Sequence, residues 1–74
     1  MKLEHLITMA NQIGDFFSSY PDQAQARHDI ANHIHRFWAH NMREQIVRHV
    51  TENQGQGLHP LVAEAIRESA SVLA

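Results

Sequence analysis

Apolar residues recur at steps of three and four along most of the chain, the spacing that gathers side chains on one face of an α-helix. The first such stretch predicts a helix over about residues 2–19, with Pro21 following it. Further periodic stretches predict helices over about residues 22–37, 42–52 and 60–73. With only two prolines and three glycines, the chain lacks the regularly spaced turns of a β-protein. The pattern therefore predicts an all-α fold, a small compact bundle of four short helices.

Individual residues mark the expected helix ends. Asp22 precedes the second helix, where its carboxylate can accept the unpaired amide hydrogens of the first turn. Asn41 precedes the third helix and Glu44 follows three residues later, a weak variant of the capping box. Pro60 suits the first turn of the fourth helix, because an amide hydrogen there would have no intrahelical acceptor. Residues 53–57, Asn-Gln-Gly-Gln-Gly, are expected to break the chain before it.

Length and composition restrict the classes of function. The 74 residues, 43% of them hydrophobic, suffice for one domain, residues 1–74, around a single core. The absence of cysteine excludes disulfides and thiolate metal sites. A net charge of −2 with only six Lys and Arg disfavours a general nucleic-acid surface. No apolar run approaches the roughly 20 residues that span a bilayer, so we expect no membrane contact and a cytoplasmic location.

Seven histidines make a metal site the first chemistry to consider. Metal ligands on one helix are typically four residues apart, whereas His28, His33 and His35 have separations of five, two and seven. Asp29 and His33 are four residues apart, but no hydroxyl or thiol is placed beside them for activation, so we expect an ordinary surface pair. The sequence therefore predicts no catalytic residue, no metal ligand and no cofactor site in this chain.

The apolar surface is larger than a small bundle needs for its core. Met9, Phe16 and Tyr20 fall beside the central stripe of the first helix and widen its apolar arc to about half the circumference. Phe37 and Trp38 are consecutive, so their side chains diverge by about 100° and one ring is expected to face outward. Each of these expectations has an alternative. The third and fourth helices could cover Met9, Phe16 and Tyr20, and Trp38 could close the domain's own core.

Charge is unevenly distributed along the chain. Residues 27–49 hold four arginines against Asp29 and Glu44, a local charge of +2, while the remainder sums to −4. This part of the molecule is therefore expected to attract an acidic partner. Aromatic and methionine anchors would contribute about 2 kcal/mol each, and arginines would orient the partner. The predicted partner-binding residues are Met9, Phe16, Tyr20, Arg36, Phe37, Trp38, Met42 and Arg43.

Three stretches together resemble a known family. Residues 9–17 read Met-Ala-Asn-Gln-Ile-Gly-Asp-Phe-Phe, residues 33–38 read His-Ile-His-Arg-Phe-Trp and lead to Met42-Arg43, and residues 57–62 read Gly-Leu-His-Pro-Leu-Val. In this combination and order, across nearly the whole chain, they resemble the formate dehydrogenase delta subunit.

The resemblance implies a non-catalytic accessory role. Members of that family are small subunits of soluble, NAD-dependent, molybdenum-containing formate dehydrogenases. The other subunits of those enzymes carry the molybdenum cofactor, iron–sulfur clusters, FMN and the NAD site. By this resemblance, the chain would assemble or stabilise such a complex by binding its large subunits, above all the molybdenum-bearing alpha subunit.

The chain departs from the family pattern at one point. The family reads Trp-Asp-Pro-basic-Met-Arg, where this chain has Trp38 and Met42-Arg43 separated by Ala39-His40-Asn41. The Asp-Pro pair resembles a helix cap followed by a first-turn proline, and here Asn41 is expected to take over the capping. Two other functions are compatible with the residues. One is a helical protein that forms a homodimer through the apolar flank of the first helix, which Met9, Phe16 and Tyr20 form. The other is a small regulatory DNA-binding domain.

Overall fold

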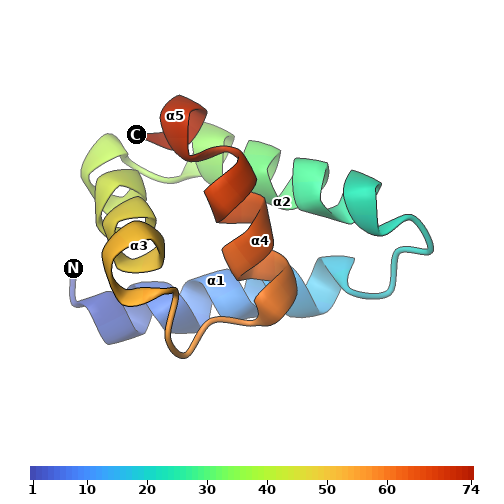
Figure 1. Cartoon of the computed structure of the whole chain (residues 1–74), viewed down its shortest axis with the longest axis horizontal. Helices are drawn as coiled ribbons and strands as arrows, with labels where there is room; N and C mark the ends of the chain where they lie inside the picture. The colour runs from blue at the N-terminus through green and yellow to red at the C-terminus, as the bar shows by residue number, and fades with distance from the viewer.

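The computed structural model describes all residues from 1 to 74 and contains five α-helices and no strand. Helices α1 and α2 lie on opposite sides of Figure 1 and are joined at one end, α3 lies at the other end, and α4 lies between them. Helix α4 packs against each of the three longer helices. The all-α fold is therefore confirmed. The helices are α1 (Leu3–Phe17), α2 (Gln23–Phe37), α3 (His40–Asn53), α4 (Pro60–Glu68) and α5 (Ala70–Leu73).

The last predicted helix is divided in two at Ser69. The backbone of Ser69 has φ −111° and ψ 17°, and its N–H is shared between the carbonyls of Ala65 and Ile66, both at 3.2 Å. The chain changes direction there, and α5 packs against α2, α3 and α4 with Leu73 fully buried. Hydrophobic periodicity continues across the break, which is why the sequence predicted one helix.

The predicted helix ends are partly confirmed. Asp22 caps α2, with its Oδ1 accepting hydrogen bonds from the amides of Ala24 at 3.0 Å and Gln25 at 3.2 Å. Pro60 is the first residue of α4, and the His59 Nδ1 before it accepts the Leu61 amide at 3.2 Å.

The expected Asn41 cap of α3 is wrong. The helix begins at His40 and its N-cap residue is Ala39, whose side chain makes no capping hydrogen bond. The extended backbones of Trp38 and Ala39 end α2 and connect it directly to α3, so no further loop residue separates the two helices. Glu44 lies 3.7 Å from the Nδ1 of His40 instead of completing a capping box.

The turn between α3 and α4 lies where residues 53–57 were predicted to break the chain. Gln54 has a left-handed backbone at φ 60°, and Gly55 and Gly57 have φ values of 67° and 88°. Glycine adopts such values without steric cost, which allows several of them within four residues. The buried ring of His49 supports this turn, because its Nε2 donates to the Gln56 carbonyl at 2.7 Å.

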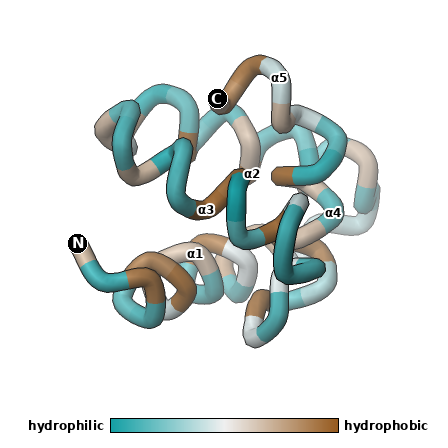
Figure 2. Tube along the Cα trace, turned by 60° about the vertical axis from the view of Figure 1, so that its left-hand side comes forward, coloured by the Kyte–Doolittle hydropathy of each residue, from teal (hydrophilic) through white to brown (hydrophobic).

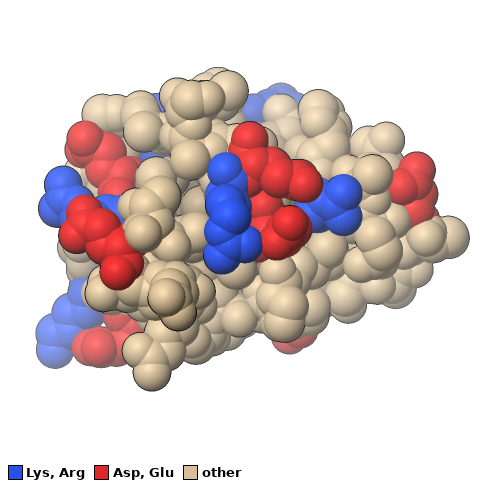
Figure 3. Space-filling model, in the orientation of Figure 1, with Lys and Arg blue, Asp and Glu red and all other residues tan.

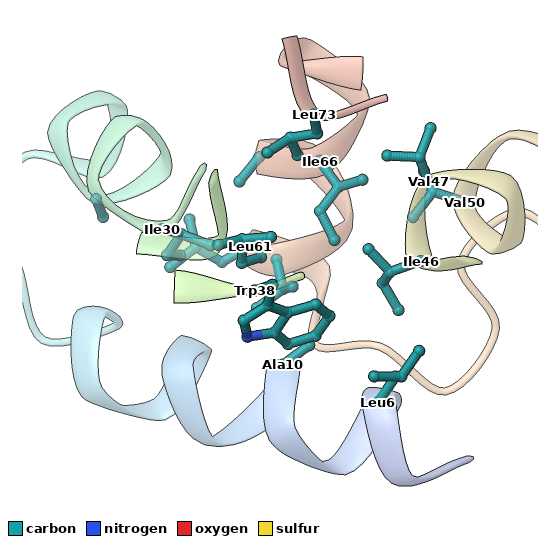
Figure 4. Packing of buried hydrophobic residues seen from close by; sticks show 14 residues of the cluster. Leu6, Ala10, Ile30, Trp38, Ile46, Val47, Val50, Leu61, Ile66 and Leu73 are labelled. Atoms are coloured by element: carbon teal, nitrogen blue, oxygen red, sulfur yellow. The ribbon is translucent and has the colours of Figure 1, made fainter. Parts of the chain in front are cut away.

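One buried cluster of hydrophobic side chains, drawn from all five helices and Trp38, forms the core. Figure 4 shows the Trp38 indole directed into the space between α1 and α4. Only 6% of Trp38 is exposed, so the structure favours the alternative in which this residue closes the domain's own core. Figure 2 shows hydrophobic stretches alternating with hydrophilic ones along α1 and α3, as expected for helices with one buried face. None of the helices has the length and hydropathy needed to cross a bilayer.

The seam between α1 and α4 is closely packed. The Asn11 side chain donates to the Gly57 carbonyl at 3.0 Å and accepts from the His59 amide at 2.8 Å, which holds the turn against α1. A Cβ at Gly14 would lie 2.5 Å from the Cγ2 of Val62, so only glycine fits between the two helices without a shift. This seam fixes which face of α1 is turned away from α4.

Candidate functional site

The outward face of α1 borders an apolar hollow of about 430 Å³. Met9 and Phe16 follow one another at helical spacing on this face, whereas Asn11 lies about 200° around the helix from Met9. The hollow therefore opens on a different side of α1 from the seam with α4. Five of its seven lining residues are hydrophobic; the lining comprises Met9, Gln12, Ile13, Phe16, Phe17, His33 and Trp38.

Two exposed aromatic rings flank this hollow, one from each helix. Phe16 of α1 is 70% exposed and Phe37 at the end of α2 is 68% exposed. The Phe37 ring lies 4.8 Å, between centroids, from the ring of His33, which lines the hollow. Large aromatic side chains at such exposures are typical of surfaces that another protein covers. The prediction that one ring of the Phe37-Trp38 pair faces outward is confirmed.

The apolar members of the predicted partner-binding set gather around the hollow. Met9, Phe16 and Trp38 line it directly. Tyr20 adjoins it through Phe17, since the Phe17 ring meets Tyr20 edge to face at 5.1 Å and Phe16 at 5.0 Å. Met9 and Tyr20 are half-buried, but α3 and α4 leave Phe16 exposed. The alternative in which those helices cover this flank is therefore wrong for Phe16.

The two predicted arginines have different surroundings. The Arg36 guanidinium lies 5.5 Å from the centroid of the Phe37 ring and makes no hydrogen bond or ion pair within the chain. Arg43 instead donates from a terminal nitrogen to the His35 carbonyl at 2.9 Å, and its Nε is buried without a partner. Arg43 thus ties α3 to the end of α2.

Met42 is half-buried against the core, and neither Met42 nor Arg43 lines the hollow.

Sequence reasoning missed part of the lining. Ile13 and Phe17 are not in the predicted partner-binding set although they line the hollow, and Gln12 carries no apolar signal. His33 could have been found from its spacing of four residues to Phe37, which places both side chains on one helix face. The expected pair of Asp29 with His33 is wrong: the two side chains make no hydrogen bond or ion pair, and the Asp29 Oδ1 instead accepts from the side-chain Nε2 of Gln25 at 2.8 Å.

The chain offers no set of ligands for a metal ion. No three His, Cys, Asp or Glu side chains lie close enough together to hold one, and the chain has no cysteine. The only polar side chains lining the hollow are those of Gln12 and His33. The hollow is therefore suited to binding apolar groups.

Comparison with models of protein families supports the resemblance seen in the sequence. Residues 5–66 match the family described as NADH-dependent formate dehydrogenase delta subunit FdsD. The matched residues extend from the first turn of α1 into α4 and include the whole lining of the hollow. No curated protein and no solved structure matches the chain. By a match that covers most of its length, the chain belongs to the FdsD family, the delta subunits of NADH-dependent formate dehydrogenase.

Proposed function

We propose that the chain is a non-catalytic accessory subunit that assembles or stabilises an NAD-dependent formate dehydrogenase. It does so by binding the alpha subunit, the large subunit that carries the molybdenum cofactor, through the hollow between α1 and α2. Membership of a delta-subunit family implies other formate dehydrogenase subunits as partners. The observation that carries the proposal is the exposure of Phe16 and Phe37 at 70% and 68%, on two helices beside one hollow.

Burial of these rings is the main source of binding free energy in this proposal. Aromatic side chains at the centre of an interface commonly contribute about 2 kcal/mol or more each. The Phe16 and Phe37 rings are large and have few rotatable bonds, so their immobilisation costs little entropy. Trp38, at 6% exposure, supports the floor of the hollow and offers little area of its own.

A non-catalytic role is consistent with the side chains of the hollow. Iron–sulfur clusters are held chiefly by cysteine thiolates. The chain has no cysteine and no metal-binding cluster, so its residues do not suit an iron–sulfur centre. We assign the molybdenum cofactor, iron–sulfur clusters, FMN and NAD to the other subunits.

The test is assembly with serine variants at the two exposed rings. Phe16→Ser and Phe37→Ser should each weaken binding to the large subunits by roughly 30-fold, which corresponds to about 2 kcal/mol. Binding is measured by titration of the purified chain into enzyme that lacks it, followed by size-exclusion chromatography. Val72→Ser is the matched control, because Val72 is 63% exposed but lies on α5, away from the lining of the hollow. Wild-type affinity in both phenylalanine variants would refute the proposal.

The two other functions make different predictions. A homodimer that uses the same flank would sediment as a dimer at micromolar concentration, and Phe16→Ser would dissociate it. A DNA-binding domain would shift a duplex at low salt with a steep salt dependence. Under the proposed function, the isolated chain should remain monomeric and should not shift DNA.

A further inference from the structure

We propose that the partner segment covering the hollow carries a carboxylate beside its apolar anchor, and that this carboxylate pairs with Arg36. The inference rests on the proposed function and adds the chemistry that the partner must present. It follows from three features of the surface around the hollow: a guanidinium without a partner, polar groups of the lining that make no hydrogen bond, and the absence of acidic residues from the lining.

Arg36 is the one arginine whose guanidinium has no partner within the chain. Figure 3 shows basic and acidic groups side by side across the middle of the molecule, where charges neutralise one another. The Arg43 guanidinium is committed to the His35 carbonyl. The other three arginines have glutamate partners: Arg27 with Glu68 at 3.0 Å, Arg67 with Glu64 at 2.9 Å and Arg48 with Glu52 at 3.7 Å.

The position of Arg36 links its charge to the hollow. Its guanidinium lies 5.5 Å from the Phe37 ring centroid, and that ring lies 4.8 Å from the His33 ring in the lining. A segment that fills the hollow and covers Phe37 therefore passes within reach of Arg36. A guanidinium held over an aromatic face keeps its edge N–H groups available for a two-point hydrogen bond to a carboxylate.

The hollow also has polar groups available for such a segment. The side chains of Gln12 and His33 line it and make no hydrogen bond within the chain. They can bind backbone groups of an incoming segment while an apolar side chain occupies the hollow. Its volume of about 430 Å³ far exceeds the roughly 30 Å³ of one water molecule, so it has room for a bulky side chain.

A second copy of this chain is a poor match for the same surface. A twofold contact of hollow against hollow would bring the two copies of Arg36 toward one another. The lining contains no Asp or Glu that could pair with either of them. The unpaired positive charge of Arg36 beside the hollow therefore favours an acidic segment of a different subunit.

Carbodiimide cross-linking of the assembled enzyme tests the presence of the carboxylate directly. Lys2 is the only lysine of the chain, so Arg36→Lys introduces a single new amine at the flank. The reagent activates a neighbouring carboxylate, which then forms an amide with that amine as the reagent leaves as a urea. We expect mass spectrometry to find a link from position 36 to an Asp or Glu of a large subunit, and no such link in the wild type. In the control, Arg48→Lys, the expected link is to Glu52 of the same chain.

Charge reversal provides the second measurement. Arg36→Glu should weaken binding to the large subunits by about tenfold or more at low salt and flatten its salt dependence. Arg48→Glu makes the same charge change at a side chain that is 70% exposed, and should alter affinity by less than about threefold.

The outcomes separate this inference from the function on which it rests. If Phe16→Ser weakens assembly while the Arg36 and Arg48 variants behave alike, the acidic partner is wrong and the proposed function stands. A cross-link from position 36 to a second copy of the chain, or no new cross-link, also overturns the inference. If neither the phenylalanine nor the Arg36 variants change assembly, both proposals are wrong.

Discussion

The two sides of α1 carry residues of one short motif but have opposite surroundings. Toward α4, both functional groups of the Asn11 amide are hydrogen-bonded and Gly14 leaves no room for a side chain. Toward the hollow, Gln12 makes no hydrogen bond and Phe16 is 70% exposed. A stretch that reads as one family motif thus combines two roles. One side holds the domain together, and we propose that the other holds the partner.

Trp38→Ala should have the largest effect, because Trp38 belongs to both regions. It is 6% exposed in the core and also supports the floor of the hollow. Truncation of a buried tryptophan costs about 3–5 kcal/mol, a large part of the roughly 4–11 kcal/mol expected for a chain of this length. Urea unfolding followed by circular dichroism measures the loss. Lost assembly in this variant would report unfolding, and a wild-type unfolding midpoint would contradict the core assignment.

Asn11→Ala tests the closed side of α1. The substitution leaves the His59 amide and the Gly57 carbonyl without their side-chain partner, so we expect a loss of about 2–3 kcal/mol in unfolding free energy. Gln12→Ala is the matched control from the adjacent position on the open side, with an expected change within about 0.5 kcal/mol. Equal losses of unfolding free energy in Asn11→Ala and Gln12→Ala would contradict the distinction between the side of α1 that faces α4 and the side that faces the hollow.

Gly14→Ala tests how tightly the seam is packed. The added methyl group meets the fully buried Val62, and overpacking of this kind costs about 1–3 kcal/mol. Alanine favours helix over glycine by about 1 kcal/mol, so the net loss should be between about 0 and 2 kcal/mol. A double-mutant cycle with Val62→Ala should show favourable coupling, since the smaller partner makes room for the methyl group. A Gly14→Ala variant more stable than the wild type would show that α1 and α4 accommodate the added methyl group at little cost, which contradicts a tightly packed seam.

Phe16→Ser should have the smallest effect on folding. Phe16 is 70% exposed, and its ring meets the Phe17 ring edge to face at 5.0 Å. We expect the unfolding free energy to change by less than about 1 kcal/mol, while assembly is weakened as proposed above. Thermal unfolding and binding are measured on the same preparation. A destabilisation above about 2 kcal/mol would make Phe16 part of the core.

Much of the fold was predictable, and the successes share a physical basis. The periodicity of α1 and α2 places their ends within about two residues of the observed ones. Asp22 accepts hydrogen bonds from backbone amides two and three residues on, and Pro60 suits a first helical turn because it has no amide hydrogen to leave unpaired. Both roles therefore follow from local sequence. The start of α3 was misplaced because two residues of extended backbone, Trp38 and Ala39, connect it to α2 without a capping side chain.

The candidate site was predicted less completely. The apolar excess of α1 placed Phe16 correctly on the surface, and the divergence of consecutive aromatic rings correctly predicted one exposed ring at the end of α2, without deciding that it is Phe37. The lining residues Ile13 and His33 were missed, since helical periodicity gave Ile13 no separate role and His33 was expected in a surface pair with Asp29. Their shared hollow exists only where α1 and α2 face each other, and residues on facing helices are far apart in sequence.

The amino-acid order alone was enough for the all-α class, the break at residues 53–57 and the presence of one outward ring at the end of α2. These features depend on spacing and on chemistry within a few residues. Packing between helices settled that Phe37 rather than Trp38 faces solvent, that Arg43 binds a backbone carbonyl while Arg36 stays free, and that the chain turns at Ser69. Those outcomes depend on distances between side chains brought together by folding, and no local pattern encodes such distances.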